Sequence, residues 1–189
     1  MNFAVNSPHK PTKAEIQACV NKTVDDIIAA HLKILFCGIN PSLYSAAVGH
    51  HFARPGNRFW KTLHGAGFTD RLFAPSEDET LPQLGYGITN IVDRATATAD
   101  QLAPEELVLG QQALAAKVQQ YRPQVLAILG VSAYRTAFKQ PKAIVGQQPN
   151  SFHGAMLWVL PNPSGLNAHY QLADLQRVYG ELRSFVLSE

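Results

Sequence analysis

The sequence is poor in cysteine and has no long apolar run. Its 189 residues include only two cysteines, Cys19 and Cys37. Two thiols cannot complete a four-cysteine iron–sulfur site or a cysteine-rich zinc site, so both classes are excluded. No apolar run approaches the length of a membrane span, and the first residues lack the basic-then-apolar pattern of a signal peptide. We therefore expect an intracellular, cytoplasmic protein that does not associate with membranes.

Charge is also scarce, because charged residues make up 16% of the chain and the net charge is +2. This balance allows a basic face that binds nucleic acid but does not by itself indicate one. A hydrophobic content of 46% argues against disorder. A chain of this length is expected to form one domain that folds without a disulfide or a metal.

Short apolar segments alternate with helical patterns along the chain. We expect strands over residues 33–37, 88–92, 125–129 and 156–160. Apolar residues at helical spacing predict helices over residues 13–30, 57–66, 104–120, 131–138 and 170–186. The alternation, with strands that are apolar almost throughout, predicts a three-layer α/β/α sandwich around a mostly parallel sheet. Residues 70–86 and 141–154 show no clear pattern.

The chain is expected to divide near residue 31. Residues 1–11 contain two prolines and are predicted to form a loose arm. Together with the following helix they make up residues 1–31, an N-terminal addition packed on the domain. Residues 32–189 are predicted to form the single main domain.

Polar residues, glycines and prolines follow each expected strand. These segments are Gly38–Ser42, Asp93–Arg94, Gly130 and Pro161–Leu166. Ligands of open parallel sheets bind beyond the carboxyl ends of the strands. The sequence therefore predicts a site at this edge of the sheet.

Asn40 is the first candidate at this edge. Gly38 allows the backbone to turn and to approach a ligand closely, and Pro41 restricts Asn40 to an extended or turn conformation. A carboxamide accepts a hydrogen bond but takes no proton at neutral pH, so Asn40 could hold a water without acting as a strong base. The alternative is an Asx turn that only stabilises the loop, and these residues alone favour that alternative.

Residues 49–60 carry a second group of candidates. Phe52 could stack on a flat heterocycle, or it could anchor its loop on the core. Arg54 and Arg58 could contact phosphates, or they could face solvent beside acidic partners. The pair of histidines at 50–51 has no third ligand at a useful spacing, so we expect no metal site.

Leu166 stands in a loop stiffened by Pro161 and Pro163, with Gly165 beside it. A leucine at the tip of a rigid loop beyond the sheet edge could insert into a base stack. The alternative is a hydrophobic staple at the start of the helix that follows. Taken alone, the loop favours the staple.

Four segments together carry a resemblance. They are GINPS at 38–42, GHHFARPGNRFWK at 49–61, GITNIVDR at 87–94 and LPNPSGLNA at 160–168. In this order and spacing the chain, from about residue 32 onward, resembles the mismatch-specific uracil-DNA glycosylase and thymine-DNA glycosylase family. The resemblance implies a mixed α/β enzyme that removes uracil from double-stranded DNA, chiefly opposite guanine, and often mispaired thymine or modified cytosine. It implies neither a metal nor a cofactor, and a monomer would suit such an enzyme.

The resemblance also implies residue roles. Asn40 aligns with the asparagine that positions water, and Phe52 aligns with the aromatic that stacks on the extruded base. The loop Gly165-Leu166-Asn167 aligns with the segment that fills the gap and contacts the widowed guanine. The other expected base contacts are Gly38, Ile39 and Ser42, and the other expected DNA contacts are Asn57, Arg58, Asn162 and Ser164.

The sequence departs from the family's pattern at three positions. Ser42 replaces a common glycine, Arg54 stands where a close bacterial relative has histidine, and Ala168 stands where that relative has arginine. The first adds a side chain beside the pocket, and the last removes a DNA contact that His169 could replace. The preference for uracil opposite guanine is therefore the expectation that these changes affect most.

Asp93 is a second catalytic candidate, because it ends the second strand at the same edge as Asn40. Its carboxylate could activate the same water as a general base, or it could pair with Arg94 or cap the following turn. Lysine-based lyase chemistry has little support, because the motif loops contain no lysine: Lys33 lies before a strand, and Lys61 lies inside a predicted helix.

Two other classes of function remain to be weighed against the glycosylase. The main alternative is a non-catalytic DNA-damage-binding protein on the same scaffold. A nucleotide-binding module is disfavoured, because the chain has no glycine-rich phosphate loop of a familiar spacing.

Overall fold

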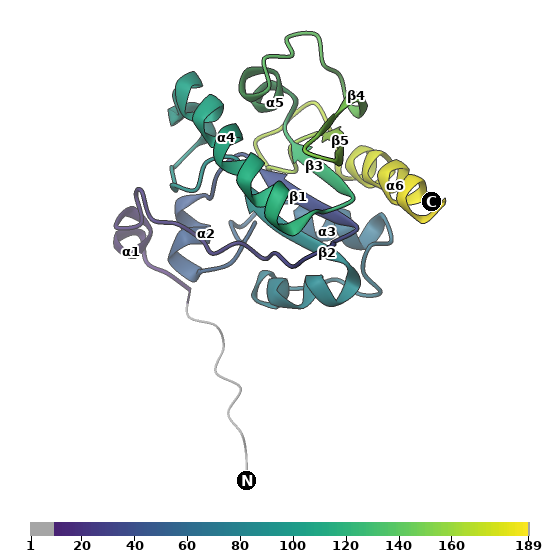
Figure 1. The fold of residues 1–189 in the computed structure, drawn as a ribbon. Coiled ribbons are helices and arrows are strands. Elements are labelled where there is room, and N and C mark those ends of the chain that lie inside the picture. The colour runs from purple at the N-terminus through teal and green to yellow at the C-terminus, as the bar shows by residue number, and fades with distance from the viewer. Residues whose placement is uncertain (1–9, 189) are drawn as a thin grey trace.

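A five-stranded sheet forms the centre of the protein (Figure 1) in the computed structural model, which describes residues 10–188. The strand order is β2-β1-β3-β5-β4. Four strands run parallel: β1 (Ile34–Gly38), β2 (Tyr86–Asn90), β3 (Val125–Leu129) and β5 (Ala155–Leu160). The edge strand β4 (Gly146–Phe152) pairs with β5 in the antiparallel direction. The predicted mostly parallel sheet is confirmed.

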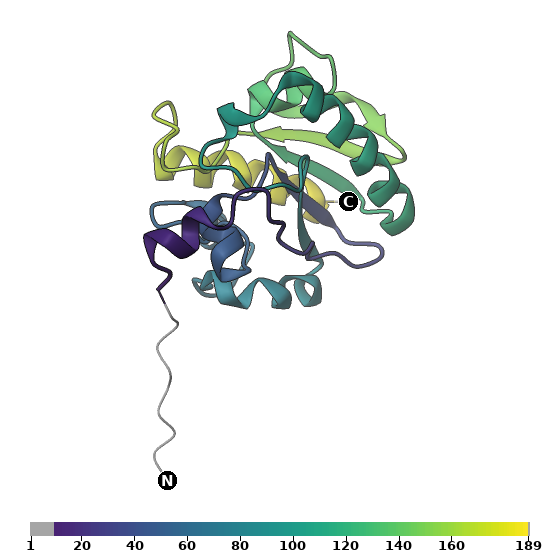
Figure 2. The same cartoon turned by 90° about the vertical axis from the view of Figure 1, so that its left-hand side faces the viewer.

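Helices cover both faces of the sheet (Figure 2). One face packs against α3 (Phe59–Gly65), the 3₁₀-helix η1 (Pro75–Leu84) and α6 (Leu172–Ser188). The other face packs against α4 (Pro104–Tyr121) and α5 (Val131–Ala137). The three-layer sandwich is therefore confirmed.

The central strand β1 shows why its sequence is apolar without alternation. Ile34 and Phe36 join the cluster under α3 and α6, whereas Leu35 and Cys37 join the cluster under α4 and α5. All four side chains have no exposed surface, and burial of each large apolar side chain contributes roughly 1.5–3 kcal/mol. Burial of both faces holds the carboxyl end of β1 in a fixed place.

The predicted strands and the four later helices are observed within two residues of their expected bounds. Four elements were not expected: α2 (Leu43–Val48), η1, η2 (Ala99–Gln101) and β4. The polar sequence of β4, GQQPNSF, contains a proline and lies at the sheet edge with a register shift between Gln147 and Ser151. An exposed, bulged edge strand has no apolar alternation that a sequence reading could detect.

The predicted helix over 13–30 is wrong beyond its first turn. Helix α1 covers only Lys13–Gln17 and begins with a capping box. The side chain of Thr12 accepts from the Glu15 N–H, and the side chain of Glu15 accepts from the Thr12 N–H. Asn21 then adopts a positive φ of 63°, and Ile27 forms an antiparallel bridge to Ile88 of β2. The free edge of β2 offers backbone hydrogen bonds to this stretch, and its β-branched residues favour an extended chain over a helix.

The N-terminal expectation can be tested only in part. The predicted arm over 1–11 lies almost entirely outside the described residues. Within 10–31 the chain packs on the domain, because Val24 is buried and the backbone of Asn21 and Lys22 bonds to Ala95. Among the described residues, no helix is long and apolar enough to cross a membrane.

Candidate active site

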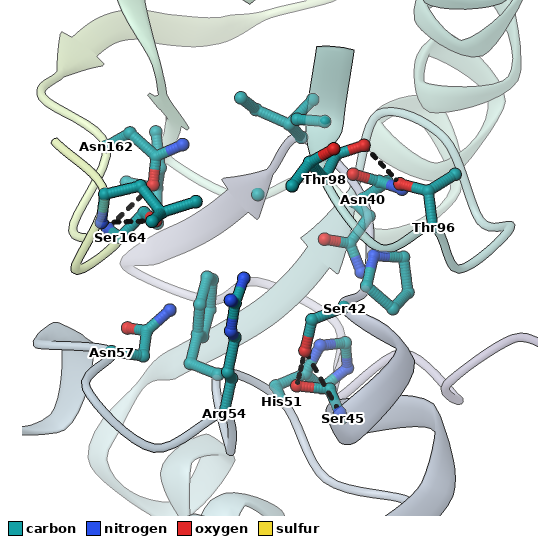
Figure 3. A pocket seen from close by; sticks show the side chains of 18 of the residues that line it. Asn40, Ser42, Ser45, His51, Arg54, Asn57, Thr96, Thr98, Asn162 and Ser164 are labelled. Carbon is teal, nitrogen blue, oxygen red and sulfur yellow. Dashed lines mark hydrogen bonds between the residues drawn. The ribbon is translucent and has the colours of Figure 1, made fainter. Parts of the chain in front are cut away.

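A cavity of about 100 Å³ opens beyond the carboxyl ends of β1 and β2 (Figure 3). This volume is far below the roughly 300–1,000 Å³ of typical sites for drug-sized ligands, so the cavity suits one small planar group. Its walls come from four segments that are distant in sequence, residues 38–45, 51–57, 96–99 and 162–166, together with Asn90 and Leu129 at the ends of β2 and β3. The sheet brings them together, as expected for an open parallel sheet.

The chemistry of the lining is unusual for a hydrolytic site. It includes four asparagines, namely Asn40, Asn57, Asn90 and Asn162. Among the described residues that line the cavity, none is Asp, Glu or Lys. Neither a carboxylate base nor a lysine nucleophile is therefore supplied by this lining.

The carboxamide of Asn40 is held in one orientation. Its Nδ2 donates to the backbone carbonyl of Arg94 at 3.0 Å and to Thr96 Oγ1 at 2.7 Å. The hydroxyl of Thr96 is itself fixed, because it donates to the Thr98 carbonyl at 2.8 Å. A carbonyl can only accept, so these partners assign the NH₂ group and leave Oδ1 without a partner among the described residues. Asn40 is not an Asx-turn residue, and Oδ1 is available as an acceptor in the cavity.

The loop that carries Asn40 is tied to the loop after β2 by backbone bonds. Val92 donates to the Ile39 carbonyl at 2.9 Å, and Thr96 donates to the Pro41 carbonyl at 3.2 Å. Ser42 then begins α2 as its N-cap, accepting from the Ser45 N–H. The position of Asn40 therefore depends on β1, α2 and the 94–98 segment together.

Two backbone N–H groups in the lining, those of Ile39 and Phe52, have no hydrogen-bond acceptor among the described residues. The great majority of backbone donors are paired in folded proteins. Two unpaired donors in one small cavity could therefore bind the carbonyl oxygens of a planar ligand.

Phe52 forms one wall of the cavity in a strained conformation. Its φ is 53°, which is unfavourable for a residue with a side chain. Its ring stacks on Phe59 with centroids 4.0 Å apart. The ring is anchored on the core, as one sequence hypothesis predicted. It also lines the cavity, and stacking on a flat heterocycle stays a prediction.

The neighbours of Phe52 hold it in this conformation. Asp78, whose side chain is 1% exposed, accepts from the His51 N–H at 2.9 Å and lies 3.0 Å from His50 Nδ1. Ser45 Oγ accepts from the Ala53 N–H at 3.1 Å. Anchors on both sides of Phe52 offset the strain and present its N–H.

His51 is a neutral member of the lining. Burial lowers its pKa below the ordinary 6.5. Its Nε2 lies 2.9 Å from the Asp25 carbonyl, which can only accept, so Nε2 carries the proton. Because the ring is neutral and bonded to the backbone, His51 braces the cavity wall and adds no charge.

Asn90 is a site residue that the sequence reading missed. It ends β2, is 4% exposed and lines the cavity, and its carboxamide has no partner among the described residues. A Cβ at Gly38 would lie 2.5 Å from Asn90 Oδ1 and 3.2 Å from Phe52 Cζ. Gly38 is therefore needed for close packing rather than for a sharp turn. A polar residue ending an otherwise apolar strand, within the motif GITN, was the available signal.

The structure does not bring Asp93 to the cavity. Its side chain is 54% exposed, and Oδ1 lies 3.2 Å from Lys117 Nζ. Lys117 also pairs with Asp26 at 2.7 Å. The suggested pair with Arg94 is absent from the described residues, because Arg94 pairs with Glu106 at 2.6 Å instead. Asp93 does not share the position of Asn40.

Residues 161–170, here called the wedge loop, form the opposite wall. Asn162 Oδ1 accepts from the Ser164 N–H at 3.0 Å, and Ser164 Oγ accepts from the Leu166 N–H at 3.2 Å. Asn167 donates to the Asn162 carbonyl at 2.9 Å and accepts from His169. Leu166 remains 66% exposed, so it is not a buried staple. The carboxamides of Asn162 and Asn167 shape the loop.

Arg54 and Arg58, both considered as phosphate contacts, lie in different surroundings. Arg58, expected at a DNA phosphate, directs its guanidinium into the protein and donates to four carbonyls of the wedge loop: Pro163, Ser164, Asn167 and Tyr170. Arg54 lines the cavity and is exposed, and its guanidinium has no partner among the described residues. Asn57 accepts from the Phe59 N–H at 2.9 Å and also lines the cavity. Arg54 is therefore the arginine available to a phosphate.

Among residues 10–188, no group of three or more His, Cys, Asp or Glu side chains could hold a metal ion. Cys37 lies under the site, where burial raises the pKa of its thiol far above the ordinary 9.0 and keeps it protonated. This thiol is a buried apolar group.

Comparisons with known proteins show a similar fold and a matching family. A solution NMR structure from Methanosarcina acetivorans, described as a "putative Uracil DNA glycosylase", matches with a TM-score of 0.56 and 18% sequence identity. The match covers 87% of this chain and 99% of the other, and at this identity it shows a shared fold. Residues 25–183 match the family described as the Uracil DNA glycosylase superfamily. That range contains all five strands and every residue that lines the cavity, so the chain belongs to the uracil DNA glycosylase superfamily.

Proposed function

We propose that the protein is a monofunctional DNA glycosylase of the mismatch-specific type. It would hydrolyse the N-glycosidic bond of uracil in duplex DNA, chiefly opposite guanine. Mispaired thymine and modified cytosines are further candidate substrates. Superfamily membership supports glycosylase activity on uracil, and the four sequence motifs support the mismatch-specific type.

The observation that carries the proposal is the fixed orientation of Asn40. Its NH₂ group is used by Arg94 and Thr96, so Oδ1 can accept a hydrogen bond from one water. An amide is a poor base, but a departing uracil leaves an oxocarbenium-like sugar that a weak, well-placed nucleophile can attack. The water oxygen bonds to C1′, the C1′–N1 bond breaks, and one proton of the water ends on uracil.

The lining also suits the leaving group. Uracil departs as an anion, and the unpaired N–H groups of Ile39 and Phe52 could donate to its carbonyl oxygens. Such preorganised donors stabilise developing negative charge. Asn90 could donate and accept along the same edge of the base, because it lines the cavity and its carboxamide has no partner among the described residues. The absence of carboxylates from the described lining avoids repulsion of the anion.

Access to a base in a duplex requires that the base be flipped out, which costs a few kcal/mol and less at a mismatch. The exposed Leu166 at the tip of the wedge loop would fill the vacated space. Phe52 would then stack on the extruded ring, and Arg54 would contact a neighbouring phosphate.

The proposal is tested by measuring base release with the wild type and Asn40→Ala side by side. The substrates are labelled duplexes with U opposite G, U opposite A or T opposite G, and single-stranded U. Release from the G·U duplex that disappears in Asn40→Ala supports both the activity and the role of Asn40. Release that survives in Asn40→Ala would move the chemistry to another group. Binding without release by the wild type would favour a damage-binding protein.

Asp93→Ala provides the matched test of the carboxylate hypothesis. Because Asp93 faces Lys117 outside the cavity, we expect its removal to leave the rate of base release unchanged. A sharp loss of turnover with DNA affinity retained would restore Asp93 as the general base.

A further inference from the structure

We propose that Arg58 is a positioning residue that holds the wedge loop in the shape needed to open duplex DNA, an inference that rests on the proposed function. It acts through Leu166 and touches neither the base nor a phosphate. The role follows from where its guanidinium donors are directed.

The guanidinium of Arg58 is surrounded by carbonyls of one loop. Nη1 donates to the Tyr170 carbonyl at 2.5 Å, and Nη2 donates to the carbonyls of Ser164 at 2.5 Å and Asn167 at 3.0 Å. Nε donates to Pro163 at 3.4 Å. These acceptors bracket Leu166 on both sides, so a single side chain fixes the two ends of the segment that bears it.

Residues 54–58 and the wedge loop also meet through their backbones. The Arg58 N–H donates to the Pro163 carbonyl at 3.0 Å. A Cβ at Gly165 would lie 2.6 Å from the Gly56 carbonyl oxygen. The two loops are therefore in direct contact at glycines, and Arg58 joins them next to that contact.

Only arginine can make this set of bonds. Its planar fork presents several donors in fixed directions, whereas the lysine ammonium is one compact charge. An exposed leucine on a loose loop would lose conformational entropy each time it entered the base stack. A loop already ordered by Arg58 avoids part of that cost.

The base-binding wall does not need Arg58 in the same way. Phe52 has its own anchors, because Asp78 and Ser45 hold the residues on either side of it. Loss of Arg58 should therefore impair the flipping of a base out of duplex DNA. It should not affect the binding and release of a base that is already unpaired. This separation distinguishes a positioning role from general instability.

The variants are Arg58→Met, which removes the donors, and Arg58→Lys, which keeps the charge. Arg177→Met is the control, because Arg177 is exposed on α6 and, within residues 10–188, its side chain pairs with Glu181 alone. We expect both Arg58 variants to lower release from the G·U duplex by about 10²-fold, and release from single-stranded uracil to stay near wild type. Equal losses on both substrates would overturn the proposal. The proposal would also be overturned if Arg58→Lys kept full activity and DNA binding by Arg58→Met depended less on salt than binding by the wild type. That pair of results indicates a phosphate contact.

A double-mutant cycle with Leu166→Ala tests whether Arg58 acts through the leucine. If it does, Arg58→Met should add little to the loss already caused by Leu166→Ala on duplex DNA. Losses that multiply would show that Arg58 acts elsewhere and would overturn the proposal.

Hydrogen exchange provides a readout that does not depend on activity. In Arg58→Met, amides of residues 162–170 should exchange faster, and those of β1 and β3 should not. Unchanged exchange in the loop would refute the positioning role, whatever the kinetics. If the wild type released uracil from none of the substrates, the proposed function would fail, and this measurement would still decide whether Arg58 holds the loop.

Discussion

The tripeptide Asn-Pro-Ser occurs twice at the edge of the sheet, as Asn40–Ser42 after β1 and as Asn162–Ser164 after β5. Both copies line the same cavity. Asn162 bonds to the Ser164 N–H two residues on, which is a local Asx turn. Asn40 instead bonds to residues more than fifty positions away. The same short sequence forms a structural turn in one place and an oriented polar group in the other.

The difference follows from what lies beside each loop. The loop after β1 runs along residues 94–98, which supply a carbonyl and a hydroxyl to the Asn40 amide. In the wedge loop, Asn162 and Asn167 bond to groups of the same loop, and Arg58 donates to several of its carbonyls. A local bond shapes a loop, whereas a long-range bond fixes an orientation relative to the rest of the site.

The largest expected contrast is between alanine substitutions of the two asparagines. Asn40→Ala should reduce the single-turnover rate on a G·U duplex by about 10²-fold or more, because the water loses its acceptor. DNA affinity should be unchanged. Asn162→Ala should reduce the rate only about tenfold, since it removes one hydrogen bond within a loop. Equal effects in rapid-quench measurements would contradict the difference in role.

Gly38→Ala should have the next largest effect. Its Cβ would lie 2.5 Å from Asn90 Oδ1, so the buried carboxamide must shift. We expect weakened binding of free uracil and a lower kcat/KM, with the Tm little changed, because the adjacent cavity can take up the movement. Calorimetric titration with uracil measures the first effect. Unaltered uracil binding would remove Asn90 from the base-binding group.

Thr96→Val tests the long-range support of Asn40 at nearly constant side-chain volume. The hydroxyl that accepts from Asn40 Nδ2 is lost, and one such bond contributes roughly 1 kcal/mol. We expect kcat to fall about fivefold, with KM for duplex DNA unchanged. A change in KM alone would show that Thr96 contacts the DNA rather than orienting Asn40.

The smallest expected effect concerns Arg94, whose carbonyl holds Asn40. Hydrogen bonds from Arg94 and from the Ala103 N–H lower the pKa of Glu106 from 4.5 to about 2. Because the folded-state pKa lies below the unfolded value, the carboxylate stabilises the fold above pH 4.5, and this contribution is lost as pH falls toward 2. Glu106→Gln should therefore lower the Tm slightly near neutral pH. The difference from wild type should shrink on acidification, and a constant difference would argue against the ion pair.

Much of the architecture could be predicted from the sequence, for a physical reason. Strands buried on both faces must be apolar throughout, and helices between them must be amphipathic, so β1, β3 and α4 have clear patterns. The helix predicted after α1 does not form, because hydrogen bonds to the edge of β2 outweigh the helical spacing of its apolar residues. Strand β4 was missed because an exposed edge strand need not be apolar.

Part of the site could also be predicted from the sequence. Motif residues at strand ends identified Asn40 and the wedge loop as candidates, and the motif over 49–61 identified Phe52; all line or border one cavity. The same rule also selected Asp93, which faces Lys117 instead. Position at a strand end places a residue near the edge of the sheet, but it does not decide which way the side chain points.

The sequence by itself determined the layered α/β architecture, the sheet edge that carries the site and the types of side chain available there. Periodic burial and the stiffness of glycine and proline loops act locally, so a linear pattern records them. Only the tertiary structure decided that Asn40 presents its carbonyl oxygen, that Asn90 joins the site and that Arg58 faces inward. Those outcomes depend on hydrogen bonds between segments far apart in the chain, and a side chain takes the partner that folding brings within reach.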